Sequence, residues 1–172
     1  MTTHPLDLLP LPGSGKLIFT PCPGTRGVAL QASIVQLRDA GASAVITMMP
    51  EDELQEAGVG ELPAMVIRSG MQWFHMPVED DAAPTETFQQ RWQQQRSMII
   101  ALLDNGETIA VHCRGGSGRT GLMAAAIMGE QGIEEDQATA LVRGLRPNSL
   151  KLPAHLDYLK SKYWNTEPQS KG

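Results

Sequence analysis

VHCRGGSGRTG, at residues 111–121, is the stretch that decides the fold of this chain. Just before it, the run TIAV at residues 108–111 has the apolar character of a buried strand. Just after it, residues 122–128 form an almost unbroken apolar run of helix-forming residues. The pattern predicts a central strand that brings Cys113 to the mouth of a glycine-rich loop, with a helix starting at once behind the loop.

This loop has the composition of an anion-binding site. Three glycines between Cys113 and Arg119 let the backbone turn so that successive N–H groups point inward. Such a nest, at the positive end of a helix, binds an oxyanion with two or three negative charges. Arg119 can fold back across the mouth and hold two oxygens with its planar guanidinium. The same positive field favours the thiolate form of Cys113, so the loop is predicted to bind an anion and to activate a nucleophile.

The order His112-Cys113, five residues, then Arg119-Thr120 resembles the signature of the cysteine-dependent protein-tyrosine and dual-specificity phosphatases. The resemblance extends from about residue 17 to residue 163. It is closest to the kinase-associated dual-specificity phosphatases and to similar bacterial phosphatases. A buried, inert cysteine beside a glycine turn would explain neither Arg119 nor the glycines.

The resemblance implies a metal-independent phosphatase without cofactors, in which the cysteine takes the phosphoryl group. Its implied substrates are phosphotyrosine and also phosphoserine or phosphothreonine of proteins. The phosphate-binding residues that it implies all lie in the loop: Arg114, Gly115, Gly116, Ser117, Gly118 and Arg119.

An acidic segment follows the strand predicted at residues 71–75. A phosphatase of this type needs an acid that protonates the leaving oxygen and later a carboxylate that takes a proton from the attacking water. In the family this aspartate lies between a strand and a long helix, ahead of the cysteine, which is the position of residues 76–84. Pro77-Val78-Glu79-Asp80 resembles the Pro-apolar-x-Asp pattern of the kinase-associated group, so Asp80 is the predicted acid. Asp81 is the alternative and Glu79 a weaker one.

Four residues are predicted to support the loop. The Thr120 hydroxyl could donate to the Cys113 thiolate and make sulfur a better leaving group, or it could only cap the helix. His112 points to the opposite strand face from Cys113, so we expect it under the loop and hydrogen-bonded to backbone. Arg143 and Arg146 match the Arg-x-x-Arg-Pro segment that helps to support the active-site loops in dual-specificity phosphatases.

Strand and helix patterns alternate along the rest of the chain. The expected class is therefore α/β, with a central, mostly parallel sheet flanked by helices on both faces, as in the dual-specificity phosphatases. We expect a single phosphatase domain over residues 1–172, with an extended arm at 1–15 and a disordered tail at 165–172. Strands are predicted at 17–19, 44–48, 71–75 and 108–111, and helices at 28–39, 50–57, 63–69, 85–103, 120–131, 134–144 and 153–163.

Composition and charge restrict the partners. The net charge of −5 and the pI of about 5.3 argue against nucleic acid and anionic membranes as partners. Two cysteines, no membrane-length apolar run and no export signal predict a cytoplasmic protein, which we expect to be a monomer.

Cys22 could protect Cys113 by forming a disulfide with it, but a small buried side chain is the simpler interpretation of Cys22. The four histidines lack the spacing of metal ligands.

Two other functions stay open. Arg114 adds a cation inside the loop, as lysine does in many lipid-phosphate phosphatases, so a phosphoinositide or another small phosphate ester is an alternative substrate. A phosphoprotein-binding module with little activity is an alternative of another class. The joint presence of Cys113, Arg119 and a candidate acid argues against it. The cysteine loop alone would also fit a rhodanese or an arsenate reductase, but neither of these enzymes needs an aspartate upstream of the loop.

Overall fold

A five-stranded sheet forms the centre of the molecule. The computed structural model describes residues 3–164 of the 172. The strand order is β1-β2-β5-β3-β4, and every neighbouring pair is parallel except the antiparallel pair of β1 and β2. The strands run over Asp7–Pro10 (β1), Lys16–Thr20 (β2), Ala42–Thr47 (β3), Gln72–His75 (β4) and Thr108–His112 (β5).

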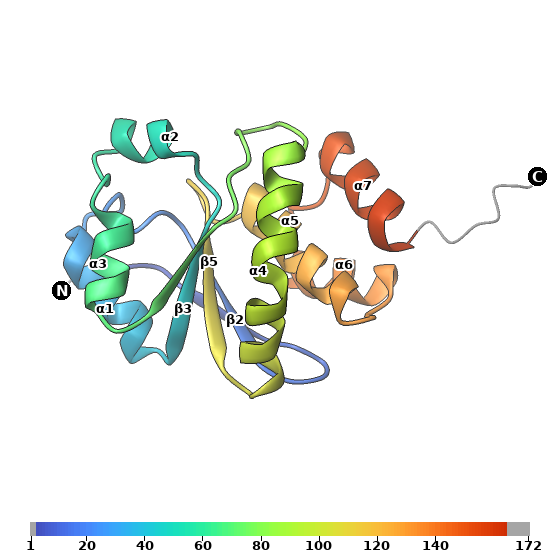
Figure 1. The fold of residues 1–172 in the computed structure, drawn as a ribbon, viewed down its shortest axis with the longest axis horizontal. Coiled ribbons are helices and arrows are strands. Elements are labelled where there is room, and N and C mark those ends of the chain that lie inside the picture. The colour runs from blue at the N-terminus through green and yellow to red at the C-terminus, as the bar shows by residue number, and fades with distance from the viewer. Residues whose placement is uncertain (1–2, 165–172) are drawn as a thin grey trace, which may run out of the picture.

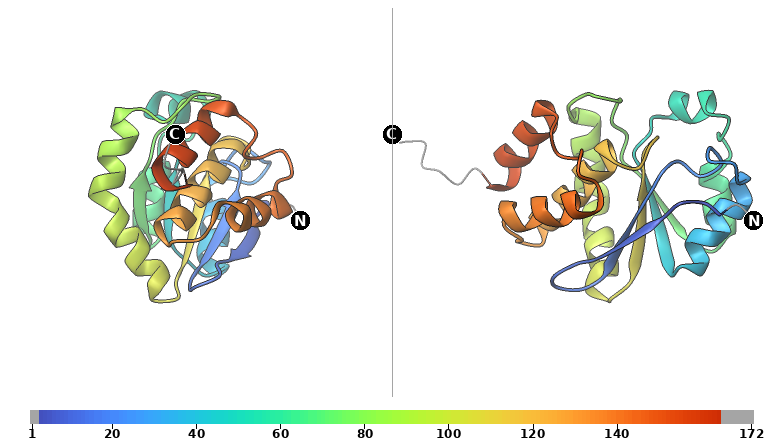
Figure 2. Two further views of the ribbon diagram at one scale, coloured as in Figure 1. Left: turned by 90° about the vertical axis from the view of Figure 1, so that its right-hand side faces the viewer. Right: turned by 180° about the vertical axis from the view of Figure 1, so that it is seen from behind.

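Helices cover both faces of the sheet (Figures 1 and 2). On one face lie α1, α2 and α3, and on the other lie α4 to α7. Their bounds are Leu30–Asp39 (α1), Glu51–Glu56 (α2), Leu62–Arg68 (α3), Glu86–Asp104 (α4), Gly118–Glu130 (α5), Glu135–Leu145 (α6) and Pro153–Leu159 (α7). A short π-helical turn, Lys160–Trp164, continues α7.

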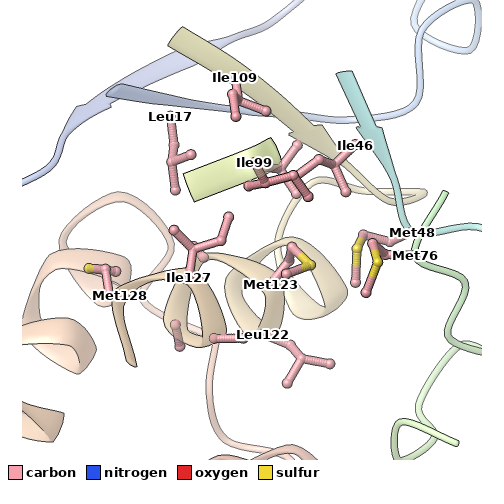
Figure 3. Packing of buried hydrophobic residues seen from close by; sticks show 14 of the residues in the cluster. Leu17, Ile46, Met48, Met76, Ile99, Ile109, Leu122, Met123, Ile127 and Met128 are labelled. Atoms are coloured by element: carbon pink, nitrogen blue, oxygen red, sulfur yellow. The ribbon is translucent and has the colours of Figure 1, made fainter. Parts of the chain in front are cut away.

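The central strand β5 is buried along its whole length, because both of its faces are covered. Its alternate residues enter two cores: Ile109 and Val111 face α4 and α5, whereas Ala110 faces the α1 side. Helix α5 is apolar on nearly every side and is buried from Arg119 to Met128. Figure 3 shows how strand side chains meet those of α4 and α5 (Leu17, Ile46, Ile109; Ile99, Met123, Ile127).

The predicted α/β class, with a mostly parallel sheet between two helical layers, is confirmed. One strand was not predicted. Within the N-terminal arm, β1 pairs with β2 over Asp7–Pro10, so this part of the arm extends the sheet. The tail predicted at 165–172 lies outside the described residues. Within the described part of the chain, no helix combines the length and apolarity needed to cross a membrane.

Candidate active site

The candidate site lies where the parallel strands end, near the start of α5 (Figure 1). Cys113 follows β5 directly and is 3% exposed. Its Sγ accepts two hydrogen bonds, from the backbone N–H of Gly116 at 3.2 Å and from the Thr120 hydroxyl at 3.2 Å. Donors that point at a sulfur stabilise its anionic form, so the arrangement suits a thiolate.

The carbonyl groups of the loop are turned outward, and each of three has a donor. His112 Nδ1 reaches the carbonyl of Cys113 at 3.1 Å, and the Cys22 N–H reaches that of Arg114 at 3.0 Å. Arg146 Nε donates to the carbonyl of Gly116 at 2.9 Å. In a trans peptide the N–H points opposite to the C=O, so the amides that follow these carbonyls face the mouth of the loop. This is the geometry of an anion nest.

Glycine is needed at position 116 for a different physical reason than at positions 115 and 118. Gly116 has a φ of +81°, and a Cβ there would lie 2.7 Å from backbone atoms of Thr20 and Pro21. It therefore needs to be glycine on both counts. Gly115 and Gly118 meet nothing within 4 Å and have negative φ, and both are exposed together with Arg114. Their lack of a side chain leaves the mouth open to a substrate.

Arg119 links the loop to two other segments and is only 2% exposed. Its Nη1 and Nη2 donate to the two carboxylate oxygens of Glu53 in α2, at 2.7 and 2.9 Å. Nη1 also donates to the carbonyl of Val78 at 2.9 Å, and Nη2 lies 3.6 Å from Asp80 Oδ1. Arg119 Nε has no hydrogen-bond partner within residues 3–164. A buried donor without a partner is costly, so this N–H is available to an incoming oxyanion.

Glu53 is a site residue that the sequence did not predict. It belongs to the run Glu51-Asp52-Glu53 in the first turn of α2, where acidic residues are expected merely to face solvent and the helix dipole. Its contact with Arg119 spans 66 residues of sequence, and no local pattern marks it.

Asp80 and Asp81 both line a cleft of about 120 Å³ beside the loop, together with Arg119, Lys151 and His155. The side chain of Asp80 is 71% exposed and faces the Arg119 guanidinium. Asp81 has a left-handed φ of 58° in the turn that follows. His155 of α7 holds this turn by a 2.9 Å hydrogen bond to the carbonyl of Ala82. Of these two carboxylates in the described part of the chain, that of Asp80 is the one within 4 Å of an Arg119 nitrogen.

Arg143 contacts the connection between α6 and α7, and Arg146 is the first residue of this connection. Arg143 Nε donates to the carbonyl of Ser149 at 3.1 Å, and its Nη2 donates to that of Leu150. Arg146 also pairs with Asp7 of β1 at 2.9 Å. Arg146 thus contacts the outer side of the loop at Gly116, whereas the hydrogen bonds of Arg143 go to the α6–α7 connection.

His112 is fully buried below the loop, in a chain of hydrogen bonds. A carbonyl only accepts, so His112 Nδ1 carries the hydrogen that goes to Cys113 O, and Nε2 accepts from the Thr47 hydroxyl at 2.8 Å. The Trp73 indole donates in turn to Thr47 Oγ1 at 2.8 Å. This arrangement uses the neutral imidazole, and burial lowers the pKa of His112 to about 4. His112 therefore does not act as a base on Cys113.

We expect the protein to lose stability when the pH falls from 7 to 5. Burial lowers the pKa of all four histidines: His4, His75, His112 and His155. In the unfolded chain a histidine takes up a proton near pH 6.5, whereas His112 in the folded protein does so only near pH 4. Between these values the unfolded state binds more protons, so acid favours unfolding. His112 alone should lower the free energy of unfolding by about 2 kcal/mol over this range.

Urea unfolding at pH 7, 6 and 5 measures this effect. A free energy of unfolding that stays constant over the range would contradict the neutral, buried state of these histidines.

Cys22 is also buried, and its thiol donates to the carbonyl of Pro23 at 3.5 Å. Burial raises the pKa of Cys22 to about 12, which keeps the thiol protonated near neutral pH. Both cysteines are free. The contacts of Cys22 suit a small buried side chain.

Comparison with protein families gives one match that covers most of the chain. The family described as "Polymorphic toxin system, DSP-PTPase phosphatase" matches residues 23–132. This range holds β3, β4, β5, α5 and the loop between β5 and α5.

Curated relatives are tyrosine phosphatases by name. A Bos taurus protein tyrosine phosphatase domain-containing protein 1 is 27% identical over 143 residues, which are 78% of this chain and 18% of that protein. A Dictyostelium discoideum probable protein tyrosine phosphatase type IVA B is 29% identical over 94 residues, which are 53% of this chain and 56% of that protein. The chain thus spans under a fifth of the first relative and just over half of the second.

Among solved structures, the fold is similar to kinase associated phosphatase with its catalytic-site cysteine replaced by serine. The TM-score is 0.82 at 21% identity, over 97% of this chain and 99% of the other.

Proposed function

This chain belongs to the DSP-PTPase phosphatase family, within the dual-specificity phosphatase superfamily, and we propose that it hydrolyses phosphate monoesters through a cysteinyl-phosphate intermediate. The observation that carries the proposal is the constellation at Cys113. A buried sulfur accepts two hydrogen bonds under an outward-turned loop, beside an arginine whose Nε–H lacks a partner among the described residues.

In the first step Cys113 Sγ attacks phosphorus, so that an S–P bond forms and the bond from phosphorus to the ester oxygen breaks. The amides of the loop and Arg119 Nε stabilise the charge on the other phosphoryl oxygens. Asp80 gives its proton to the leaving oxygen. Glu53 holds Nη1 and Nη2 of Arg119, which directs the remaining Nε edge toward the phosphate.

In the second step a water molecule attacks the phosphocysteine. An O–P bond forms, the S–P bond breaks, and Asp80, now a carboxylate, takes the proton of the water. Sulfur leaves as a thiolate, which Gly116 N–H and the Thr120 hydroxyl stabilise. The enzyme returns to its starting state without any cofactor.

Phosphorylated proteins are the proposed substrates, with phosphotyrosine and phosphoserine or phosphothreonine as target groups. The mouth of the loop is open at Gly115 and Gly118, and the cleft beside it is small, which suits side chains of different length. The exposed Arg114 and Lys151 favour an additional negative charge on the substrate, and they keep phosphoinositides or other small phosphate esters as a second candidate. Because a thiolate nucleophile has to stay reduced, we propose the cytoplasm as its compartment.

Para-nitrophenyl phosphate hydrolysis in the presence of EDTA tests the proposal. We expect turnover that neither EDTA nor added divalent ions change by more than about twofold, because Cys113 supplies the nucleophile and no step uses a metal ion. Turnover that EDTA abolishes would contradict the cysteine mechanism. Tight phosphate binding without turnover would instead indicate a phosphoprotein-binding module. A panel of phosphotyrosine peptides, phosphothreonine peptides and phosphoinositides then ranks the substrate classes.

A further inference from the structure

Ser149 is a buried hydroxyl that the proposed mechanism does not yet use. It lies in the connection between α6 and α7 and is 1% exposed. Its Oγ–H donates to the carbonyl of Ser117 at 2.8 Å, across 32 residues of sequence. Ser117 is the last residue of the loop before α5, so this hydrogen bond ends directly on the phosphate-binding segment.

The carbonyl of Ser117 belongs to the same peptide unit as the N–H of Gly118. It accepts the Ser149 hydroxyl and also the N–H of Gly121, at 2.8 Å. Because the unit is planar and trans, fixing the carbonyl on the outside turns the Gly118 N–H toward the mouth of the loop. We propose that Ser149 is a positioning residue that aims this amide at the bound oxyanion. The inference rests on the proposed function, since it concerns the same anion site.

Gly121 supports this reading through its lack of a side chain. A Cβ at Gly121 would lie 1.8 Å from Ser149 Oγ and 3.1 Å from Cγ1 of Val142. The α6–α7 connection can therefore reach the first turn of α5 only because residue 121 is glycine. The space that the missing side chain leaves is occupied by the Ser149 hydroxyl.

The backbone of Ser149 is itself held in place. Its N–H donates to the carbonyl of Arg146 at 3.0 Å, and its carbonyl accepts from Arg143 Nε at 3.1 Å. Arg146 Nε holds the carbonyl of Gly116 at 2.9 Å. One short segment thus fixes two consecutive loop peptides, with a guanidinium on the first and a hydroxyl on the second. Groups held this way are preorganised and need no rearrangement when the anion binds.

The test compares Ser149→Ala with Ser33→Ala. Ser33 is a matched control. It is a fully buried serine of α1, and its hydroxyl donates to the carbonyl of Ala29 at 3.0 Å. Tungstate binding, measured by calorimetry on the purified full chain, reports on the anion site without turnover. We expect Ser149→Ala to bind tungstate about tenfold more weakly, the size of effect typical of one lost hydrogen bond, and Ser33→Ala to bind as the unmodified protein does. The Tm of both variants should fall to a similar extent.

Gly121→Ala is the second variant, because its Cβ pushes the Ser149 hydroxyl away. It should weaken tungstate binding as Ser149→Ala does, and it should weaken binding less when Ser149 is already alanine, since the two changes act on one contact. Tungstate binding by Ser149→Ala that equals binding by Ser33→Ala would overturn the positioning role. If the unmodified protein binds tungstate but does not hydrolyse para-nitrophenyl phosphate, the proposed phosphatase activity is wrong. The comparison of tungstate binding by the variants then still tests the role of Ser149. No binding by the unmodified protein would overturn both.

Discussion

Turnover of para-nitrophenyl phosphate should fall by roughly 10⁴-fold or more when Cys113 is replaced by serine, as for the loss of a nucleophile in other covalent enzymes. A serine hydroxyl becomes a comparable nucleophile only when a base takes its proton. The nearest candidate, His112, cannot do so, because its two nitrogens are bound to Cys113 O and Thr47 Oγ1. The anion nest is backbone, so Cys113→Ser should still bind tungstate.

Cys22→Ser is the matched control for this prediction. The Cys22 thiol reaches the carbonyl of Pro23, and burial raises its pKa to about 12, so it contributes no thiolate. Steady-state kinetics and tungstate calorimetry on the two variants separate the contributions of the two thiols to turnover and to anion binding. If Cys113→Ser keeps more than a tenth of the turnover, Cys113 is not the nucleophile. If Cys22→Ser binds tungstate normally but loses as much turnover as Cys113→Ser does, the loss is not specific to the Cys113 thiol and the assignment fails.

The central elements could be predicted because their sequence signals are local. Residues 108–128 contain a buried strand, a glycine loop and an apolar helix in direct succession, and the structure has β5, the loop and α5 there. The helix predicted from residue 120 begins at Gly118, because the first turn contains the loop residues themselves. The strand β1 was missed, because Pro5, Pro10 and Pro12 suggest a segment without sheet pairing. Pro10 is tolerated because β1 is an edge strand, where a missing N–H costs nothing.

What the sequence could not predict is which distant side chains complete the site. Glu53 and Ser149 are ordinary residues in their own segments, an acid in a first helical turn and a serine in a turn. They acquire a role only because the fold brings α2 to Arg119 and the α6–α7 connection to Ser117. Tertiary contacts of this kind produce no periodicity or motif spacing in the sequence from which they could be predicted. The same holds for Asp7, whose contact with Arg146 spans 139 residues.

The position of Glu53 determines which edge of the Arg119 guanidinium is free to meet an anion. From the sequence, Arg119 is predicted to hold two phosphate oxygens with its planar guanidinium. In the structure Glu53 takes one hydrogen bond from each Nη atom, and Val78 takes another from Nη1. These contacts hold the side chain in place before any anion arrives, and they leave the Nε–H and one N–H of Nη2 on the same edge of the guanidinium for the proposed phosphate. A guanidinium held this way loses little further conformational entropy on binding.

Replacing Asp80 by asparagine should lower kcat by about 10² to 10³-fold, within the range for loss of a general acid, with little change in KM. Asparagine keeps the shape of the side chain but has no proton to give to the leaving oxygen. The loss should be larger for phenyl phosphate than for para-nitrophenyl phosphate, because a poorer leaving group depends more on protonation. The nearness of Asp80 Oδ1 to Arg119 Nη2, at 3.6 Å, is the structural reason for choosing this residue.

Asp81→Asn is the matched control, since Asp81 lines the same cleft with the same chemistry but sits in a left-handed turn held from α7 by His155. Asparagine also tolerates a φ of 58°, so this variant should fold normally. We expect its kcat to stay within about threefold of the unmodified protein for both esters, because the acid at Asp80 is retained. The prediction is wrong if Asp81→Asn loses more kcat than Asp80→Asn does and if this loss grows with the pKa of the leaving group. Asp81 would then be the general acid.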